Sequence, residues 1–126
     1  MSEDRKRKMI GLFRLDIFNL EVAVFATDAE RVAFLTDEDC DPDDHDPGAI
    51  AHTHLDTTRG GEPRLTMVIK PHATEATIAH ECVHLADFAM HALGIPTGFE
   101  NTEVRAYIVG HAFAEIMDQE GGRTSG

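Results

Sequence analysis

The sequence has few basic residues, little cysteine and no long hydrophobic run. Lys and Arg number 11 against 23 Asp and Glu in 126 residues, which gives a formal net charge of −12. Because affinity for a phosphate backbone comes mostly from Lys and Arg, this balance disfavours nucleic acid as a partner. Two cysteines are too few for a disulfide framework. No apolar run approaches the roughly 20 residues that cross a bilayer, so we expect no membrane partner.

The N-terminus also lacks the pattern of a secretory signal peptide, because Arg14 and Asp16 interrupt the apolar stretch that begins at Met9. The basic run near the start is typical of a solvated end, and we expect residues 1–9 and 120–126 to be disordered. A hydrophobic content of 42% is nevertheless enough for a core. We therefore expect one domain over residues 1–126, located in the cytoplasm.

Turn and capping residues divide the chain into strand and helix patterns. The expected elements are a strand or bent pair of strands over 12–25 with a turn at Asn19, a helix over 29–35, strands over 49–55 and 64–70, and helices over 74–93 and 102–119. Thr27 or Asp28 caps the first helix. Gly94 ends the second helix, and Gly121 with Gly122 ends the third. This order predicts the α+β class, with a small mixed or antiparallel sheet packed on the last two helices.

An acidic segment over residues 37–47 offers many oxygen ligands for a cation. It lacks, however, the Asp-x-Asp-x-Asp-Gly pattern and the closing Glu of an EF-hand. We therefore favour a solvated acidic loop over a calcium site.

The most informative pattern is an HExxH motif at residues 80–84, inside the predicted helix 74–93. Residues four apart lie on one helical face, so the imidazoles of His80 and His84 can hold one zinc ion. Glu81 projects beside the metal, where it can accept a proton from zinc-bound water. The motif therefore predicts a zinc site with a general base next to it.

A catalytic zinc site needs a third protein ligand. His91 shares the helical face of His80, but a separation of about 16 Å along the axis puts it out of reach. Glu100 and Glu103 come at the start of the next helix, which can fold back across the motif helix. We predict Glu103 as the ligand, because the small Ala106 on its helix permits a close approach. Glu100 is the alternative, and both carboxylates are also favourable near the positive end of a helix dipole.

Further residues near the motif are candidates for supporting roles. Tyr107 and His111 lie one and two turns after Glu103, from where either can reach a developing oxyanion, although packing is the ordinary interpretation of both. Asp87 can accept the ring N–H of a ligand histidine. Cys82 faces away from the two flanking histidines, so we expect it to pack in the core.

His52 and His54 form a second, weaker signal. Alternate residues of a strand share a face, so both imidazoles point the same way along the predicted strand 49–55. They could form a separate two-ligand site, but no further ligand for them is evident in the sequence.

The combination of His80, Glu81 and His84 with the Glu-x-x-Ala segment that begins at Glu103 resembles the gluzincin type of zincin metallopeptidase. It is similar in particular to small intracellular and phage-encoded peptidases, including the ImmA/IrrE relatives. The resemblance covers about residues 64–118. It implies a minimal zincin-like fold and Zn2+ bound by two histidines and Glu103. It also implies Glu81 as the general base in the hydrolysis of a peptide or protein substrate.

The resemblance further implies that the strand before the motif helix, residues 64–70, is the edge along which an extended peptide docks. Full-sized gluzincins carry a C-terminal subdomain that closes the cleft, whereas only a few polar residues follow the helix 102–119 here. We therefore expect a shallow cleft unless the acidic segment 37–47 or a second copy in a homodimer walls it, and a narrow substrate range or dependence on a partner protein that completes the cleft.

Two other functions are compatible with the motif. A zincin-like binding or regulatory module would use zinc structurally, with protein groups at all four positions. A deformylase is disfavoured because that chemistry uses a Cys ligand from a Gly-Cys-Leu-type segment, whereas Cys40 lies among aspartates. The leading expectation is a zinc-dependent metallopeptidase.

Overall fold

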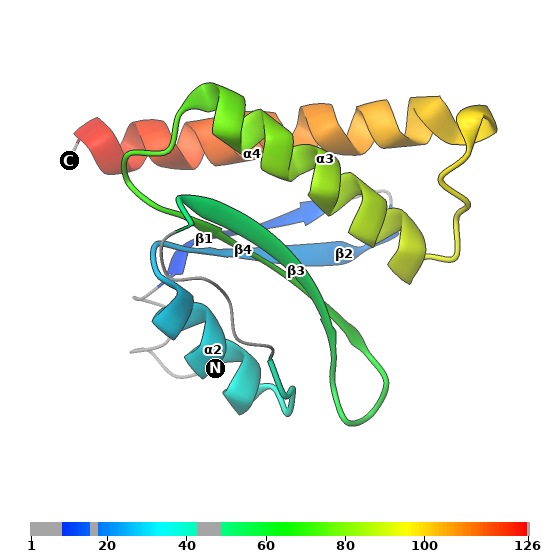
Figure 1. The fold of residues 1–126 in the computed structure, drawn as a ribbon, viewed down its shortest axis with the longest axis horizontal. Helices are drawn as coiled ribbons and strands as arrows, with labels where there is room; N and C mark the ends of the chain where they lie inside the picture. The colour runs from blue at the N-terminus through cyan, green and yellow to red at the C-terminus, as the bar shows by residue number, and fades with distance from the viewer. Residues whose placement is uncertain (1–8, 16–17, 43–48, 126) are drawn as a thin grey trace.

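The computed structural model describes residues 9–15, 18–42 and 49–125. In this part of the chain the elements are β1 (Met9–Leu15), β2 (Leu20–Phe25), α2 (Asp28–Asp37), β3 (Ala51–Thr57), β4 (Pro63–Ile69), α3 (Glu75–Ala92), the short 3-10 helix η2 (Phe99–Asn101) and α4 (Thr102–Ser125). The strands form one mixed sheet in the order β1-β2-β4-β3. Helices α3 and α4 cover one face of the sheet and α2 lies on the other (Figure 1). The predicted α+β class is confirmed.

The first two strands form an antiparallel hairpin. β1 pairs with β2, and Leu15 lies opposite Leu20 next to the turn. Asn19 in the turn has a φ of 52°, in the left-handed region that asparagine tolerates better than most residues. The expected bent pair of strands with its turn at Asn19 is therefore confirmed.

The two central strands are parallel. β2 runs parallel to β4, with Val22 opposite Leu65, and the chain passes through α2 and β3 between them. β3 pairs antiparallel with the other side of β4, with Thr53 opposite Met67. β4 is thus an interior strand and β3 is an edge strand.

This strand order corrects one expectation. Residues 64–70 were expected to form the edge strand for a docked peptide, but β4 is paired on both sides and β3 takes the edge. Residues 65–69 are all buried, which is typical of a strand covered on both faces. The apolar run of β4 therefore indicates an interior position, whereas the local pattern of 49–55 does not show which strand lies outermost.

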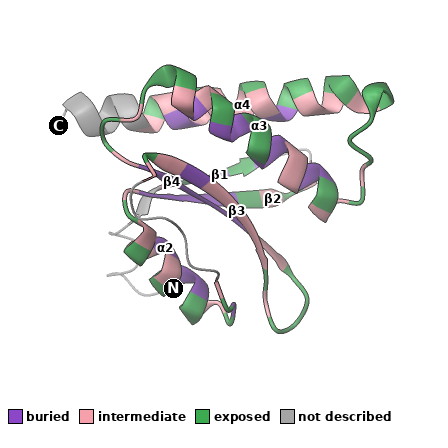
Figure 2. Ribbon diagram, viewed as in Figure 1, coloured by how far each residue is buried: buried purple, intermediate pink, exposed green. Residues whose placement is uncertain are grey.

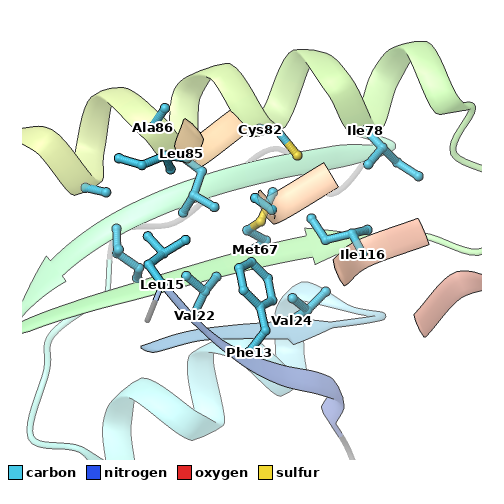
Figure 3. Packing of buried hydrophobic residues seen from close by; sticks show 14 of the residues in the cluster. Phe13, Leu15, Val22, Val24, Met67, Ile78, Cys82, Leu85, Ala86 and Ile116 are labelled. Atoms are coloured by element: carbon cyan, nitrogen blue, oxygen red, sulfur yellow. The ribbon is translucent and has the colours of Figure 1, made fainter. Parts of the chain in front are cut away.

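Two hydrophobic clusters hold the helices to the sheet. Successive side chains of a strand point to opposite faces, so β2 serves both clusters. Val22 and Val24 belong to the larger cluster under α3 and α4, and Ala23 and Phe25 to the smaller cluster against α2. Figure 2 shows buried residues on the helix faces that are turned to the sheet. Figure 3 shows the larger cluster, with Met67 between α3 and the strands.

Helix α3 begins and ends at the predicted signals. The Oγ1 of Thr74 accepts a hydrogen bond of 3.2 Å from the backbone N–H of Thr77. At the other end Gly94 has a φ of 72°, and the N–H of Ile95 donates to the carbonyl of Met90 at 2.8 Å, as in helices that end with a left-handed residue. These local contacts place the HExxH motif near the middle of the helix.

Helix α4 is longer than expected. Its predicted end at Gly121 and Gly122 is wrong, because the helix continues to Ser125. Each glycine in a helix interior costs about 1 kcal/mol relative to alanine. A helix that is already nucleated over several turns can tolerate this cost, since propagation is easier than nucleation.

The expected disordered ends are also corrected in part. Met9 is the first residue of β1, and residues 120–125 extend α4. Residues 1–8 and 126 lie outside the described part of the chain, as does much of the acidic segment, from 43 to 47. Within the described residues, none of the helices combines the length and the apolar character that a bilayer crossing requires.

A buried ion pair fastens α2 to the sheet. Arg31 is fully buried, and its Nε donates to Asp28 Oδ1 at 2.7 Å. One of its terminal nitrogens lies 3.7 Å from Asp56 Oδ2 on β3. A buried charge without partners is strongly disfavoured. The two carboxylates therefore make it possible to bury the Arg31 guanidinium between α2 and the sheet.

Replacing Arg31 by alanine is expected to lower the free energy of unfolding by about 3–5 kcal/mol, because it leaves the carboxylates without their buried cation. Arg14→Ala is the matched control. Arg14 pairs with Glu21 at 2.7 Å, but both side chains are half-exposed, and such pairs contribute about 1 kcal/mol or less. Urea unfolding followed by circular dichroism measures both values, and equal losses would contradict the role of Arg31.

Candidate metal centre

The two histidines of the HExxH motif lie on the outer side of α3. His80 and His84 are exposed, whereas Glu81 is 8% exposed and Cys82 is fully buried. Successive helical residues differ in direction by about 100°. Glu81 therefore turns from the histidine face toward β3, and Cys82 turns into the core.

The two imidazoles converge on one point. The Nε2 atoms of His80 and His84 are 3.1 Å apart, and the ring planes are inclined by 78°. Zinc–nitrogen bonds of about 2.0–2.1 Å in a tetrahedral site place two ligand nitrogens roughly 3.3 Å apart. The pair therefore fits one zinc ion. The ligand atoms of His80, Glu81 and His84 all lie within 4.8 Å of one another.

The carboxylate of Glu81 is held from the edge strand. The hydroxyl of Thr53 donates to Glu81 Oε1 at 2.8 Å and lies 3.3 Å from the Glu81 carbonyl oxygen. A nearly buried carboxylate requires such a partner, because an unpaired polar group is costly to bury. The hydrogen bond orients one carboxylate oxygen and leaves the second one to accept a proton.

The predicted third ligand, Glu103, does not join this group. Glu103 is exposed in the first turn of α4. Arg105 turns toward α3, where its Nε donates to Asp87 Oδ1 at 3.0 Å. Helical residues two apart differ in direction by about 200°, so Glu103 leaves α4 on the opposite flank. Glu100 is exposed in η2, with its carboxylate beside Gly98.

The three residues with predicted supporting roles have other partners. The Nε2–H of His111 donates to the carbonyl oxygen of Arg14 at 2.9 Å. Tyr107 stacks on His111 with ring centroids 6.0 Å apart, and it meets Phe18 edge-on. Asp87 accepts the guanidinium described above. These contacts join α4 to β1, to Phe18 and to α3, and none of the three residues belongs to the converging group on α3.

Two residues that matter here were missed by the sequence analysis. Thr53 lies between His52 and His54 in β3. Successive side chains of a strand point to opposite faces, so Thr53 faces α3 while the two histidines face α2. This alternation was the signal in the sequence that could have identified Thr53. Asp28 lies 3.8 Å from His52, measured from Oδ1 to Nε2. This contact joins residues far apart in the sequence, so no local pattern could have found it.

The two cysteines are buried thiols. Burial, with the charge of Glu81 as a smaller second cause, raises the pKa of the Cys82 thiol to about 12. The pKa of Cys40 is also raised, mainly by burial and next by the charge of Asp56. Only the thiolate binds metals or acts as a nucleophile. The predicted packing role of Cys82 is confirmed by its place in the larger cluster.

Comparison of the chain with protein-family models gives no match, and searches of curated proteins and of solved structures find no significant match.

Neither thiol is expected to react with iodoacetamide in the folded protein near neutral pH, because Cys40 and Cys82 are buried and protonated. For Cys82 the protection should persist as the pH rises toward about 12, as long as the chain stays folded. Mass spectrometry of the alkylated chain, before and after unfolding in urea, measures the protection. Labelling of Cys82 in the folded chain would contradict the assignment.

Ligation by Glu103 stays a prediction, and it requires the first turn of α4 to rotate. Glu103→Gln is expected to weaken zinc binding at His80 and His84 by at least about tenfold, since even outer partners of a zinc site contribute 10–100-fold. Glu100→Gln is the matched control and should leave the affinity unchanged. Competition with a chromogenic chelator measures both. An unchanged affinity in Glu103→Gln would remove this residue from the ligand set.

Proposed function

We propose that the chain is a zinc-dependent peptidase with Glu81 as its general base. One observation carries the proposal: a nearly buried carboxylate and two convergent imidazoles come from one helical turn, and their ligand atoms lie within 4.8 Å of one another. A structural histidine pair needs no such carboxylate beside it. A hydrolytic site does, because the attacking water must lose a proton.

The roles of the residues follow from their positions. Zinc held by His80 and His84 would supply a Lewis acid that acidifies water and polarises a carbonyl group. Glu81 takes the proton of the attacking water on its free carboxylate oxygen and passes it to the leaving amine. The hydroxyl of Thr53 donates a hydrogen bond of 2.8 Å to the other oxygen, Oε1, and this bond restrains rotation of the carboxylate. This arrangement supports hydrolysis of an amide bond.

The edge strand β3 supports an extended peptide as the substrate. The N–H of Lys70 donates to the carbonyl of Ile50 at 3.0 Å. Hydrogen-bonded and non-hydrogen-bonded pairs alternate in an antiparallel ladder, so the main-chain groups of Ala51, Thr53 and Leu55 point away from β4. A peptide added along this edge would pass the residue that holds Glu81.

The outward position of the histidines supports a shallow site. A cavity of about 430 Å³ lies between the sheet and α2, lined by residues such as Leu12, Ala23 and Phe34, and the motif residues do not line it. A second copy or a partner protein would then supply a wall for the substrate. The same feature favours a second candidate function, a zincin-like binding module in which the metal supports recognition.

Glu81→Gln is expected to lower hydrolysis by about 10²–10⁴-fold, because general-base catalysis contributes that much. Zinc content should be unchanged, since the glutamine leaves both imidazoles in place. Cleavage of unfolded casein, followed by mass spectrometry, is the assay. Glu75→Gln is the control, an exposed glutamate of the same helix, and it should keep full activity.

The outcomes separate the two functions. Loss of cleavage in Glu81→Gln with zinc retained supports the peptidase. A zinc-loaded wild-type protein that cleaves no bond in casein, or a Glu81→Gln variant as active as the wild type, would reject the general-base assignment and favour the binding module.

A further inference from the structure

A second group of metal-binding side chains lies on the α2 side of β3. His52 and His54 point to this face, and Asp28 reaches them from the first turn of α2. The His52 Nδ1 and His54 Nε2 atoms are 2.6 Å apart, with the rings inclined by 87°. Asp28 Oδ1 lies 3.8 Å from His52 Nε2. The ligand atoms of the three residues all lie within 4.8 Å of one another.

This group is separate from the HExxH motif. Neighbouring strand residues point to opposite faces, so Thr53 reaches Glu81 on α3 while the histidines on either side of it face α2. His52 is only 5% exposed, so its imidazole is held in the protein interior and not at the surface. The proposed peptidase mechanism makes no use of the cluster.

The donor set suits a divalent first-row transition metal. Two imidazoles and one carboxylate are the ligands of many zinc, iron and cobalt sites. The 2.6 Å separation between His52 and His54 is shorter than the roughly 2.7–3.2 Å of ordinary hydrogen bonds from N–H donors. An ion about 2.0–2.1 Å from each nitrogen in a tetrahedral site would hold them roughly 3.3 Å apart, so the pair opens by roughly 0.7 Å on binding.

The surroundings of the cluster favour an ion. Arg31 holds Asp28 through a hydrogen bond to Oδ1, as outer partners of metal-binding carboxylates do. Thr66 lies opposite His54 in the ladder, and directly paired residues share a face. The hydroxyl of Thr66 is fully buried and has no hydrogen-bond partner among the described residues. Such a hydroxyl can form a hydrogen bond to one of the side chains that bind the ion, or to a water molecule bound to the ion.

We propose that Asp28, His52 and His54 form a second binding site for a divalent transition metal, with Zn2+ as the ion to test first. The site joins the start of α2 to the edge strand, across the acidic connection that separates them in the sequence. Because Thr53 lies between two of the ligands, the ion also fixes the strand segment that holds Glu81. The role is structural and does not depend on peptidase activity.

The test uses a chain without the first site. The double variant His80→Ala/His84→Ala is expected to bind about one equivalent of Zn2+ per chain, since three convergent ligands hold one ion. Adding His54→Ala should abolish this binding. Adding His91→Ala instead is the matched control, because His91 is exposed and outside both groups. Equilibrium dialysis with elemental analysis measures the zinc, and circular dichroism verifies folding.

A measurement without a further mutation covers the case in which the triple variant does not fold. Long-range proton–nitrogen NMR spectra of the folded double variant report each imidazole nitrogen. Added Zn2+ should shift the ring-nitrogen signals of His52 and His54 and leave those of His91 in place. Absence of zinc binding by the folded double variant, or unchanged signals from both histidines, would overturn the proposal. Both results stand whether or not the wild-type chain cleaves peptides.

Discussion

The hydrogen bond from Thr53 to Glu81 joins the two elements on which the candidate site depends. It links the edge strand to the motif helix and satisfies a carboxylate that is only 8% exposed. Low-dielectric surroundings strengthen such a bond and make an unpaired group costly. A hydroxyl orients the carboxylate without placing a positive charge next to it. A lysine or an arginine in the same position would add such a charge. The hydrogen bond therefore holds the carboxylate in a fixed position beside the two imidazoles.

The same strand segment builds two different environments because of its pleat. One face of β3 supplies Thr53 to α3, and the other supplies His52 and His54 to α2. On the α2 side of the strand, the buried Arg31 donates a hydrogen bond to Asp28 and so holds this carboxylate in place. A shift of the β3 register by one residue would exchange the two faces and destroy both arrangements at once. The pairing of β3 with β4 therefore holds both groups of side chains in place.

Local signals were sufficient to predict the elements that carry the motif. The cap at Thr74 and the glycine at Gly94 bound the motif helix in the structure as they do in the sequence. Both act through contacts within a few residues, so a linear pattern contains them. The convergence of His80 and His84 is equally local, because it follows from helical geometry.

The features that were wrong or missed depend on contacts between distant residues. The position of β3 at the edge is a property of the whole sheet, and the meeting of Asp28 with His52 requires α2 to pack beneath it. The length of α4 past Gly121 depends on a helix that is already formed. None of these follows from the spacing of residues along the chain.

The direction of His80 and His84 determines from which side a further ligand of the proposed zinc site would come. Cys82 and Leu85 are fixed in the core, so α3 cannot rotate to turn His80 and His84 inward. A third ligand would therefore have to approach from the outer side of the helix. The connection over 93–101 is mostly exposed, and segments with few buried contacts rearrange at low cost.

The start of α4 is held to α3 by a partly exposed pair between Arg105 and Asp87. Such pairs contribute little free energy, because water screens them. For Glu103 to reach the histidine pair, the first turn of α4 would have to give up this ion pair and the packing of Val104 against the core.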